Sequence, residues 1–173
     1  PEVFGSIYAM SPSILNWGAD FYPGHPGFRN AIKAQNIEAL SEDPYALAFV
    51  AMARVFSADP ERRPFGVALP VTSSKGHFSK DSSVIKLWER NFVNNMIPRY
   101  AEGLRQLNGL AIDWGMQDAY AHIPSSCREL CQKFDQMQIP YQKENYEGGH
   151  YDKIPGITGR FYRKVIPFFS SHL

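Results

Sequence analysis

Three short apolar runs along the chain have the pattern of buried β-strands. VFGSIYAM (residues 3–10) and GLAIDWG (109–115) are continuous runs of apolar residues, and turn-forming residues end each of them. PYQKENYEGG (140–149) alternates apolar with polar residues, which favours a strand nearer the edge of a sheet. The pattern therefore predicts three strands, two of them well buried.

Helical periodicity separates the later strands. In PSSCRELCQKFDQM (124–137), apolar residues recur three and four positions apart and form one helical face: Cys127, Leu130, Cys131, Phe134 and Met137. After the third strand, GRFYRKVIPFFSSHL predicts a terminal helix with Phe161, Val165, Ile166 and Phe169 facing inward and a bend at Pro167. Strands alternating with helices predict the α/β class, with a parallel sheet that helices cover.

The segment 11–99 departs from this alternation. It carries helical patterns around 28–40, 44–57 and 82–107, and Pro98 is expected to break or kink the last of these. Such a long insertion between two strands of one sheet is usually functional. We expect a single domain over 1–173 with a cap or lid at 11–99, although a helical layer that only packs on the sheet is the alternative.

Charge and composition exclude several classes of function. The 173 residues carry a formal net charge of +1 with the two signs interleaved, so no basic stripe indicates a nucleic-acid partner. No apolar run approaches the length of a membrane span.

Cys127 and Cys131 are four residues apart on one predicted helix, which favours two buried thiols over a disulfide or a metal site. We expect no metal and no cofactor.

Two polar residues follow the second and third strands and could meet. Asp118 comes three residues after Gly115, and His150 directly follows two glycines after the third strand. Functional groups of an open parallel sheet gather beyond the carboxyl ends of its strands. A carboxylate that holds an imidazole makes it a general base. The alternative is a loop-capping aspartate and a surface histidine.

The order of these motifs resembles a known family. PEVFGSIYAMSPS is similar to the segment after the nucleophile helix of α/β-hydrolase esterases, the group of S-formylglutathione hydrolase and enterochelin-esterase-like enzymes. FSADPERRPFGVALPV and LWERN resemble the cap of the enterochelin-esterase-like branch, and the ending G-x-x-D, helix, strand, E-G-x-H, helix resembles the family's C-terminal part. The resemblance implies an α/β-hydrolase fold, a small-molecule ester substrate, Asp118 as triad acid and His150 as triad base.

The chain departs from that family at the nucleophile. No G-x-S-x-G motif occurs in it; Ser6 falls inside a predicted strand, and Ser11 and Ser13 lack a strand-to-helix elbow. We therefore expect the C-terminal part of a serine carboxylesterase, inactive alone, that pairs through an exposed sheet edge with the N-terminal part or with itself. A catalytically inactive truncated domain that serves as a binding or assembly module is the alternative.

Several other residues are candidates for a substrate pocket or for structural roles. Four aromatic residues are candidates to line a substrate pocket, although core packing is the commoner role of such residues: Trp17, Phe21, Tyr22 and Trp88. We interpret Asp113, which lies within its predicted strand, as a structural residue. His122 would orient a loop or cap a helix. His25 and His77 fall in loops, without a second ligand at metal spacing.

Overall fold

The computed structural model describes residues 3–172, which form two compact units. Residues 3–20 and 93–172 make the first unit, and residues 21–92 make the second. The second unit falls within the segment 11–99 that the sequence marks as an insertion. Its role as a cap stays a prediction.

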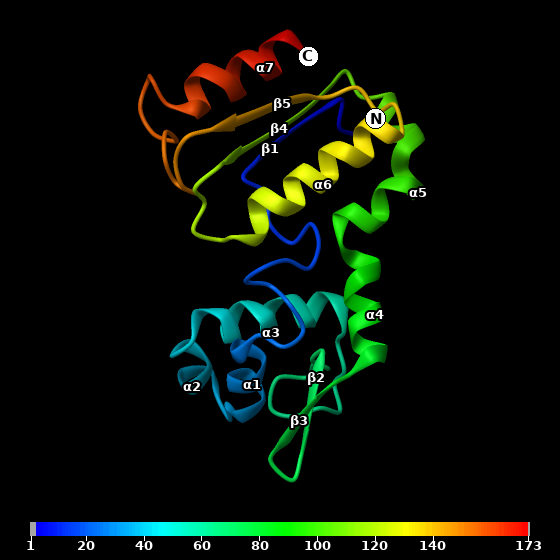
Figure 1. Cartoon of the computed structure of the whole chain (residues 1–173), viewed down its shortest axis with the longest axis vertical. Coiled ribbons are helices and arrows are strands. Elements are labelled where there is room, and N and C mark those ends of the chain that lie inside the picture. The colour runs from blue at the N-terminus through cyan, green and yellow to red at the C-terminus, as the bar shows by residue number, and fades with distance from the viewer. Residues whose placement is uncertain (1–2, 173) are drawn as a thin grey trace. The chain divides into compact units, whose positions relative to one another are not determined.

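A parallel sheet of three strands organises the first unit (Figure 1). β4 (Gly109–Gly115) lies between β1 (Ser6–Met10) and β5 (Gln142–Tyr146) and is buried along its whole length. Ser6 is opposite Gly109, and Ala111 is opposite Gln142. The three predicted strands and the α/β class are thus confirmed, and the more polar strand lies at an edge as expected. Of the two strands expected to be well buried, only β4 is: β1 is the other edge strand, and its residues are partly exposed.

Helices cover both faces of this sheet (Figure 1). α5 (Val93–Arg105) and α6 (His122–Gln136) pack with one face of β4, and α7 (Ile166–Ser171) lies on the other face. The main core is made of apolar side chains from β4, α5, α6 and two connecting segments: Leu15, Ile97, Ala101, Leu110, Ile112, Trp114, Ile123, Cys127, Leu130, Cys131, Phe134 and Ile139. Burial of these side chains stabilises the sheet and sets the position of its carboxyl edge.

The terminal helix buries a different face from the one predicted. A π-helical turn (Phe161–Val165) leads into α7. The buried apolar residues of the two segments are Val165 in the π turn and Phe168 in α7. Phe161, Ile166 and Phe169 were expected inward but are 46%, 45% and 37% exposed. The wider π turn shifts the residues that follow around the axis, so a pattern read at 3.6 residues per turn selects the wrong face.

The helix does not break at Pro98, and an interruption lies earlier in the chain. α4 (Ser82–Asn91) ends at Phe92, which is extended, and α5 then runs through Pro98. Proline removes the N–H that would bond the Asn94 carbonyl one turn before it. The Lys133 ammonium of α6 donates to that carbonyl at 2.5 Å instead. A partner from the neighbouring helix thus stabilises a proline inside α5.

The second unit is a small helical assembly with a hairpin. α1 (Pro26–Lys33), α2 (Ile37–Ser41) and α3 (Pro44–Phe56) precede a hairpin of β2 (Val71–Ser74) and β3 (His77–Lys80), and α4 follows it. The sequence patterns predicted one helix where α1 and α2 lie and did not predict the hairpin. Its core is aromatic: Phe28 stacks on Phe49 at 4.0 Å between ring centroids, and Trp88 packs edge-on against Phe28.

Candidate active site

The loops after β4 and β5 are joined at the carboxyl edge of the sheet. The Met116 N–H donates to the Tyr146 carbonyl at 2.9 Å, and the Gln117 N–H donates to the Gly148 carbonyl at 3.0 Å. These bonds extend the pairing of β4 and β5 beyond the strands. The residues that follow in each loop are therefore held close together.

Glycine is needed where the two loops cross. A Cβ on Gly115 would lie 2.4 Å from the Gly148 carbonyl oxygen, and Gly148 has a φ of +143°, which side chains strongly disfavour. Only glycine at both positions allows so close an approach. The glycines before His150 thus let the second loop turn toward the first.

Asp118 and His150 meet at this crossing. Asp118 Oδ2 lies 2.8 Å from His150 Nδ1; the carboxylate is fully buried and the imidazole is 22% exposed. The other carboxylate oxygen, Oδ1, accepts the Tyr120 N–H at 2.9 Å. One carboxylate therefore fixes its own loop and holds the histidine of the neighbouring loop.

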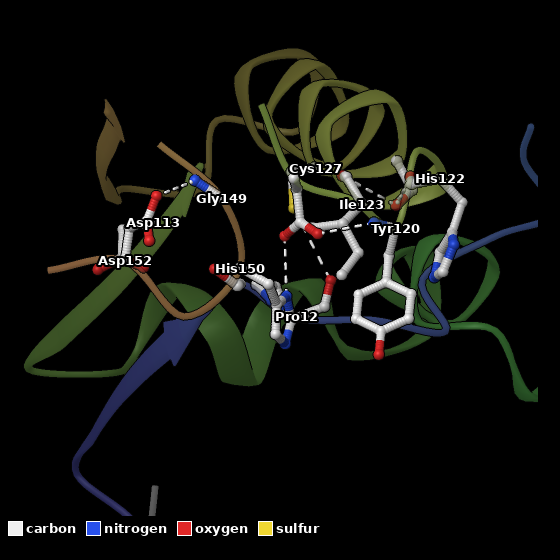
Figure 2. A network of polar contacts seen from close by, with 12 residues as sticks. Pro12, Asp113, Tyr120, His122, Ile123, Cys127, Gly149, His150 and Asp152 are labelled. Atoms are coloured by element: carbon white, nitrogen blue, oxygen red, sulfur yellow. Dashed lines mark hydrogen bonds and ion pairs between the residues drawn. The ribbon is translucent and has the colours of Figure 1, made fainter. Parts of the chain in front are cut away.

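Two aromatic rings and a second carboxylate lie around the histidine, and Figure 2 shows the Tyr120 ring and the Asp152 carboxylate among them. The rings of Tyr120 and Tyr151 lie edge-on to His150, at 5.1 and 4.7 Å between centroids. Asp152 accepts the Gly149 N–H at 2.7 Å, which ties the backbone just before the histidine. The orientation of the imidazole is thus restricted from several directions.

This arrangement sets the chemistry of the ring. A carboxylate only accepts hydrogen bonds, so Nδ1 of His150 carries the proton that it shares with Asp118. The lone pair of the neutral ring is then on Nε2, which bonds to no residue that the structure describes. A partly exposed imidazole held in this tautomer can accept a proton from a reacting group.

A buried polar network lies on the α7 side of the sheet. Arg160 forms an ion pair with Asp113 and lies 4.2 Å from the Tyr146 ring centroid, and the Tyr8 hydroxyl donates to Asp113 Oδ2 at 3.0 Å. Burial raises the pKa of Asp113, and the adjacent Arg160 guanidinium opposes that rise. The Asp113–Arg160 ion pair therefore links side chains of all three strands.

Tyr146 connects this network to the histidine loop. Its hydroxyl donates to the Gly149 carbonyl at 3.2 Å, next to His150, and lies 3.4 Å from Ser11 Oγ. Ser11 is buried at the end of β1 and has a φ of +42°, which is unusual for a residue with a side chain. Ser6 lies within β1 and bonds the His172 carbonyl, and Ser13 is exposed.

Sequence reasoning missed a second carboxylate–imidazole pair. Asp20 Oδ1 accepts both the His122 backbone N–H at 2.7 Å and Nδ1 of its ring at 2.8 Å. Burial acts to raise the pKa of Asp20, but these bonds outweigh it and lower the pKa. The contact ties the loop after β1 to the first residue of α6. The sequence around His122 could not predict this contact, because Asp20 lies in a loop about a hundred residues earlier.

The proposed aromatic pocket residues have different environments. Phe21 and Trp88 lie in the core of the second unit, 3% and 0% exposed, where the Trp88 indole donates to Ser57 Oγ at 2.8 Å. That packing favours the core role for both. Tyr22 is 41% exposed beside His25, and Trp17 belongs to the first unit. No described cavity brings these four residues together.

The structure of residues 3–172 bears on the cysteines, on metal binding and on membrane spans. Cys127 and Cys131 are buried free thiols, as expected. Within that range no cluster of three or more histidine, cysteine or acidic side chains is placed to hold a metal ion. Nor does any helix in that range have the length and apolar character needed to cross a membrane.

Comparison with known proteins does not extend these observations. The sequence matches no protein-family model, and it matches no curated protein. A functional interpretation therefore depends on the geometry of the site and on the order of its motifs.

Proposed function

We propose that this chain carries the acid and base of a serine-type carboxylic ester hydrolase. The observation that supports this most is the 2.8 Å contact between a fully buried Asp118 carboxylate and a partly exposed His150, at the carboxyl ends of adjacent parallel strands. Active sites of open α/β sheets lie at this edge. The order of acid and then histidine, each after a strand, is that of the α/β-hydrolase series.

Each residue has a defined part in the proposed reaction. Nε2 of His150 takes the proton of a serine hydroxyl as the serine attacks the ester carbonyl, and gives that proton to the leaving alcohol. Asp118 stabilises the imidazolium formed meanwhile. Water then attacks the acyl-serine with His150 again as base, releasing the carboxylic acid. The serine would come from outside these 173 residues, since they contain no G-x-S-x-G motif.

The proposal is tested first with the chain alone. We expect no hydrolysis of p-nitrophenyl acetate above that of His150→Ala, and no labelling by a fluorophosphonate probe. Turnover that depends on His150, together with labelling, would contradict the claim that the nucleophile lies elsewhere. Ser11, with its positive φ at the end of β1, would then be the first residue to substitute.

A second test uses the open reading frame that encodes the chain. Where an in-frame G-x-S-x-G segment precedes these residues, the longer protein should hydrolyse short acyl esters. His150→Ala and Asp118→Asn should each lower kcat/KM by about 10³-fold or more. The exposed His77→Ala on β3 is the matched control and should leave turnover unchanged. Turnover that survives His150→Ala would refute the proposal.

An inactive binding or assembly module is the alternative, and the open edge of β1 is compatible with it. In the described part of the chain β1 pairs only with β4, which leaves the other edge of β1 open for another strand. If the reading frame begins near these residues and encodes no serine elbow, this second function gains over hydrolysis.

A further inference from the structure

The hydroxyl of Tyr146 contacts the residue that precedes His150. Tyr146 is the last residue of β5 and is 7% exposed, and its carbonyl accepts the Met116 N–H at 2.9 Å. Its hydroxyl donates to the Gly149 carbonyl at 3.2 Å. The loop that carries His150 is therefore bonded back to the strand from which it leaves.

The Tyr146 side chain is itself held at its ring face and at its hydroxyl. The Arg160 guanidinium lies 4.2 Å from the ring centroid, a distance typical of a cation over an aromatic face, and its ion pair with Asp113 fixes it there. Ser11 Oγ, at the end of β1, lies 3.4 Å from the hydroxyl. Because Tyr146 donates its single proton to Gly149, Ser11 is the donor in this long contact. Neighbours from several elements thus restrict the position of the hydroxyl.

Burial keeps the Tyr146 hydroxyl protonated. It raises the pKa of Tyr146, and the nearby Ser11 hydroxyl opposes that rise without cancelling it. A protonated phenol can donate to a carbonyl, whereas a phenolate can only accept. The contact with the Gly149 carbonyl therefore persists at neutral pH.

The other bonds of Gly149 arise within its own loop. The Asp152 carboxylate accepts the Gly149 N–H at 2.7 Å, and the Asp152 N–H donates to the Gly149 carbonyl at 3.3 Å. These bonds shape the loop, whereas the Tyr146 hydroxyl attaches it to β5. His150 is the next residue, so a shift of Gly149 would change the 2.8 Å contact between the imidazole and Asp118.

We propose that Tyr146 is a positioning residue for His150. Through the Gly149 carbonyl, its hydroxyl sets where the imidazole lies relative to Asp118. Ser11, which is 6% exposed, supports that hydroxyl and is not a nucleophile. This role rests on the proposed function, because the placement of the ring matters for catalysis only if Nε2 acts as a base.

The ring nitrogens of His150 test this proposal in the chain alone, without any ester. Tyr146→Phe removes the hydroxyl and keeps the aromatic ring. Imidazole ¹⁵N shifts should then show that the ratio of Nδ1-protonated to Nε2-protonated ring falls about threefold or more, because the carboxylate contact loosens. Tyr141→Phe is the matched control, since its hydroxyl bonds to α6 and its loss should leave the His150 shifts unchanged. Circular dichroism checks that each variant is folded.

A second variant decides the matter if Tyr146→Phe does not fold. Ser11→Gly removes the supporting hydroxyl and relieves a φ of +42°, so this chain should stay folded and lower the same ratio, though by less. A folded Tyr146→Phe chain with the parent's His150 shifts, a Tyr141→Phe chain that moves them equally, or a Ser11→Gly chain that leaves them unchanged would each overturn the proposal. Ester hydrolysis by a longer protein is a separate measurement, so failure of the proposed function would not be mistaken for failure of this one.

Discussion

At the scale of single residues, burial governs the chemistry of the side chains around the sheet. Burial raises the pKa of Cys127 to about 12 and also raises that of Cys131. The thiolate is the reactive form of cysteine. Both thiols are therefore held in their unreactive form by the core that they help to fill.

This burial predicts slow thiol chemistry in the folded chain. At pH 8, Ellman's reagent should label neither cysteine of the native protein rapidly and both of them in guanidinium chloride. The measurement is the absorbance of the released thiolate over time. Rapid labelling of the native chain, at the rate of the unfolded one, would show that α6 does not protect these residues.

The Asp118–His150 contact predicts a fixed imidazole tautomer. With the neutral ring donating from Nδ1 to Asp118, ring ¹⁵N shifts should show the proton on Nδ1. Asp118→Asn should remove this preference, because an amide can either donate to Nδ1 or accept from it. The exposed His77 is an internal reference that should not respond. An unchanged His150 spectrum in the variant would mean that Asp118 does not orient the ring.

Sequence reasoning singled out both members of this pair because each one lies in the loop that follows a strand. The ends of adjacent parallel strands meet by topology, so the strand pattern alone brings Asp118 and His150 near each other. It could not find the Asp20–His122 contact. That contact depends on how an irregular loop is shaped by distant packing, which no local periodicity records.

At the scale of elements, capping side chains and donors from neighbouring helices bond the backbone groups that a helix leaves without a partner. Asp81 precedes α4 and accepts the N–H groups of Ser83 and Val84 at 3.0 and 3.2 Å. The Ser83 hydroxyl and these N–H groups outweigh desolvation and lower the pKa of Asp81. The ionised carboxylate is thus the form that the folded helix prefers.

Removing this cap should destabilise the second unit in a pH-dependent way. Asp81→Ala should cost about 1 kcal/mol of unfolding free energy at pH 7. Because the folded pKa lies below the unfolded value, near 3.8, the cost should persist above that value and shrink as the pH falls through the folded pKa. Urea unfolding of the parent chain and of Asp81→Ala between pH 2 and 7 measures this difference in unfolding free energy. Asp81→Asn, which keeps a cap, is the control, and a cost as large as that of alanine would contradict the capping role.

The pairing of Lys133 with the Asn94 carbonyl predicts coupling between two helices. Lys133→Met should destabilise the first unit by about 1–3 kcal/mol, because the carbonyl whose usual helical donor is missing at Pro98 loses the lysine ammonium that bonds it. In a Pro98→Ala background the backbone regains an N–H that can bond that carbonyl, so the same lysine substitution should cost less. A double-mutant cycle by denaturant unfolding measures the difference. Equal costs in both backgrounds would refute the explanation.

Two differences between the helices and the sequence patterns share one cause. The continuation of α5 through Pro98 depends on a lysine from α6, and the face of α7 depends on a π turn before it. Local rules for proline and for 3.6-residue periodicity are correct on average but do not include such partners. The central strand was easier to predict, because β4 is buried along its whole length and therefore appears as a continuous apolar run.

At the scale of the whole molecule, the open edge of β1 is the feature with the widest consequences. The Ser11 N–H donates to the Asp113 carbonyl and the Gly5 carbonyl accepts the Asn108 N–H, so odd-numbered residues of β1 point their backbone groups at β4. Residues 6, 8 and 10 then point theirs at the open edge. Unpaired strand edges recruit other strands, and Val3 and Phe4 beside this one are exposed.

We therefore expect the isolated chain to self-associate through β1, and two proline substitutions separate this from other surfaces. Met10→Pro removes an N–H that faces the open edge, so it should leave the β1–β4 ladder intact while lowering the mass measured by light scattering toward that of a monomer. Ala9→Pro removes an N–H that faces β4 and should instead destabilise the fold. Circular dichroism on heating checks that the Met10→Pro chain stays folded. A parent chain that is monomeric at every concentration, or a folded Met10→Pro chain that associates as the parent does, would show that this edge is not the interface.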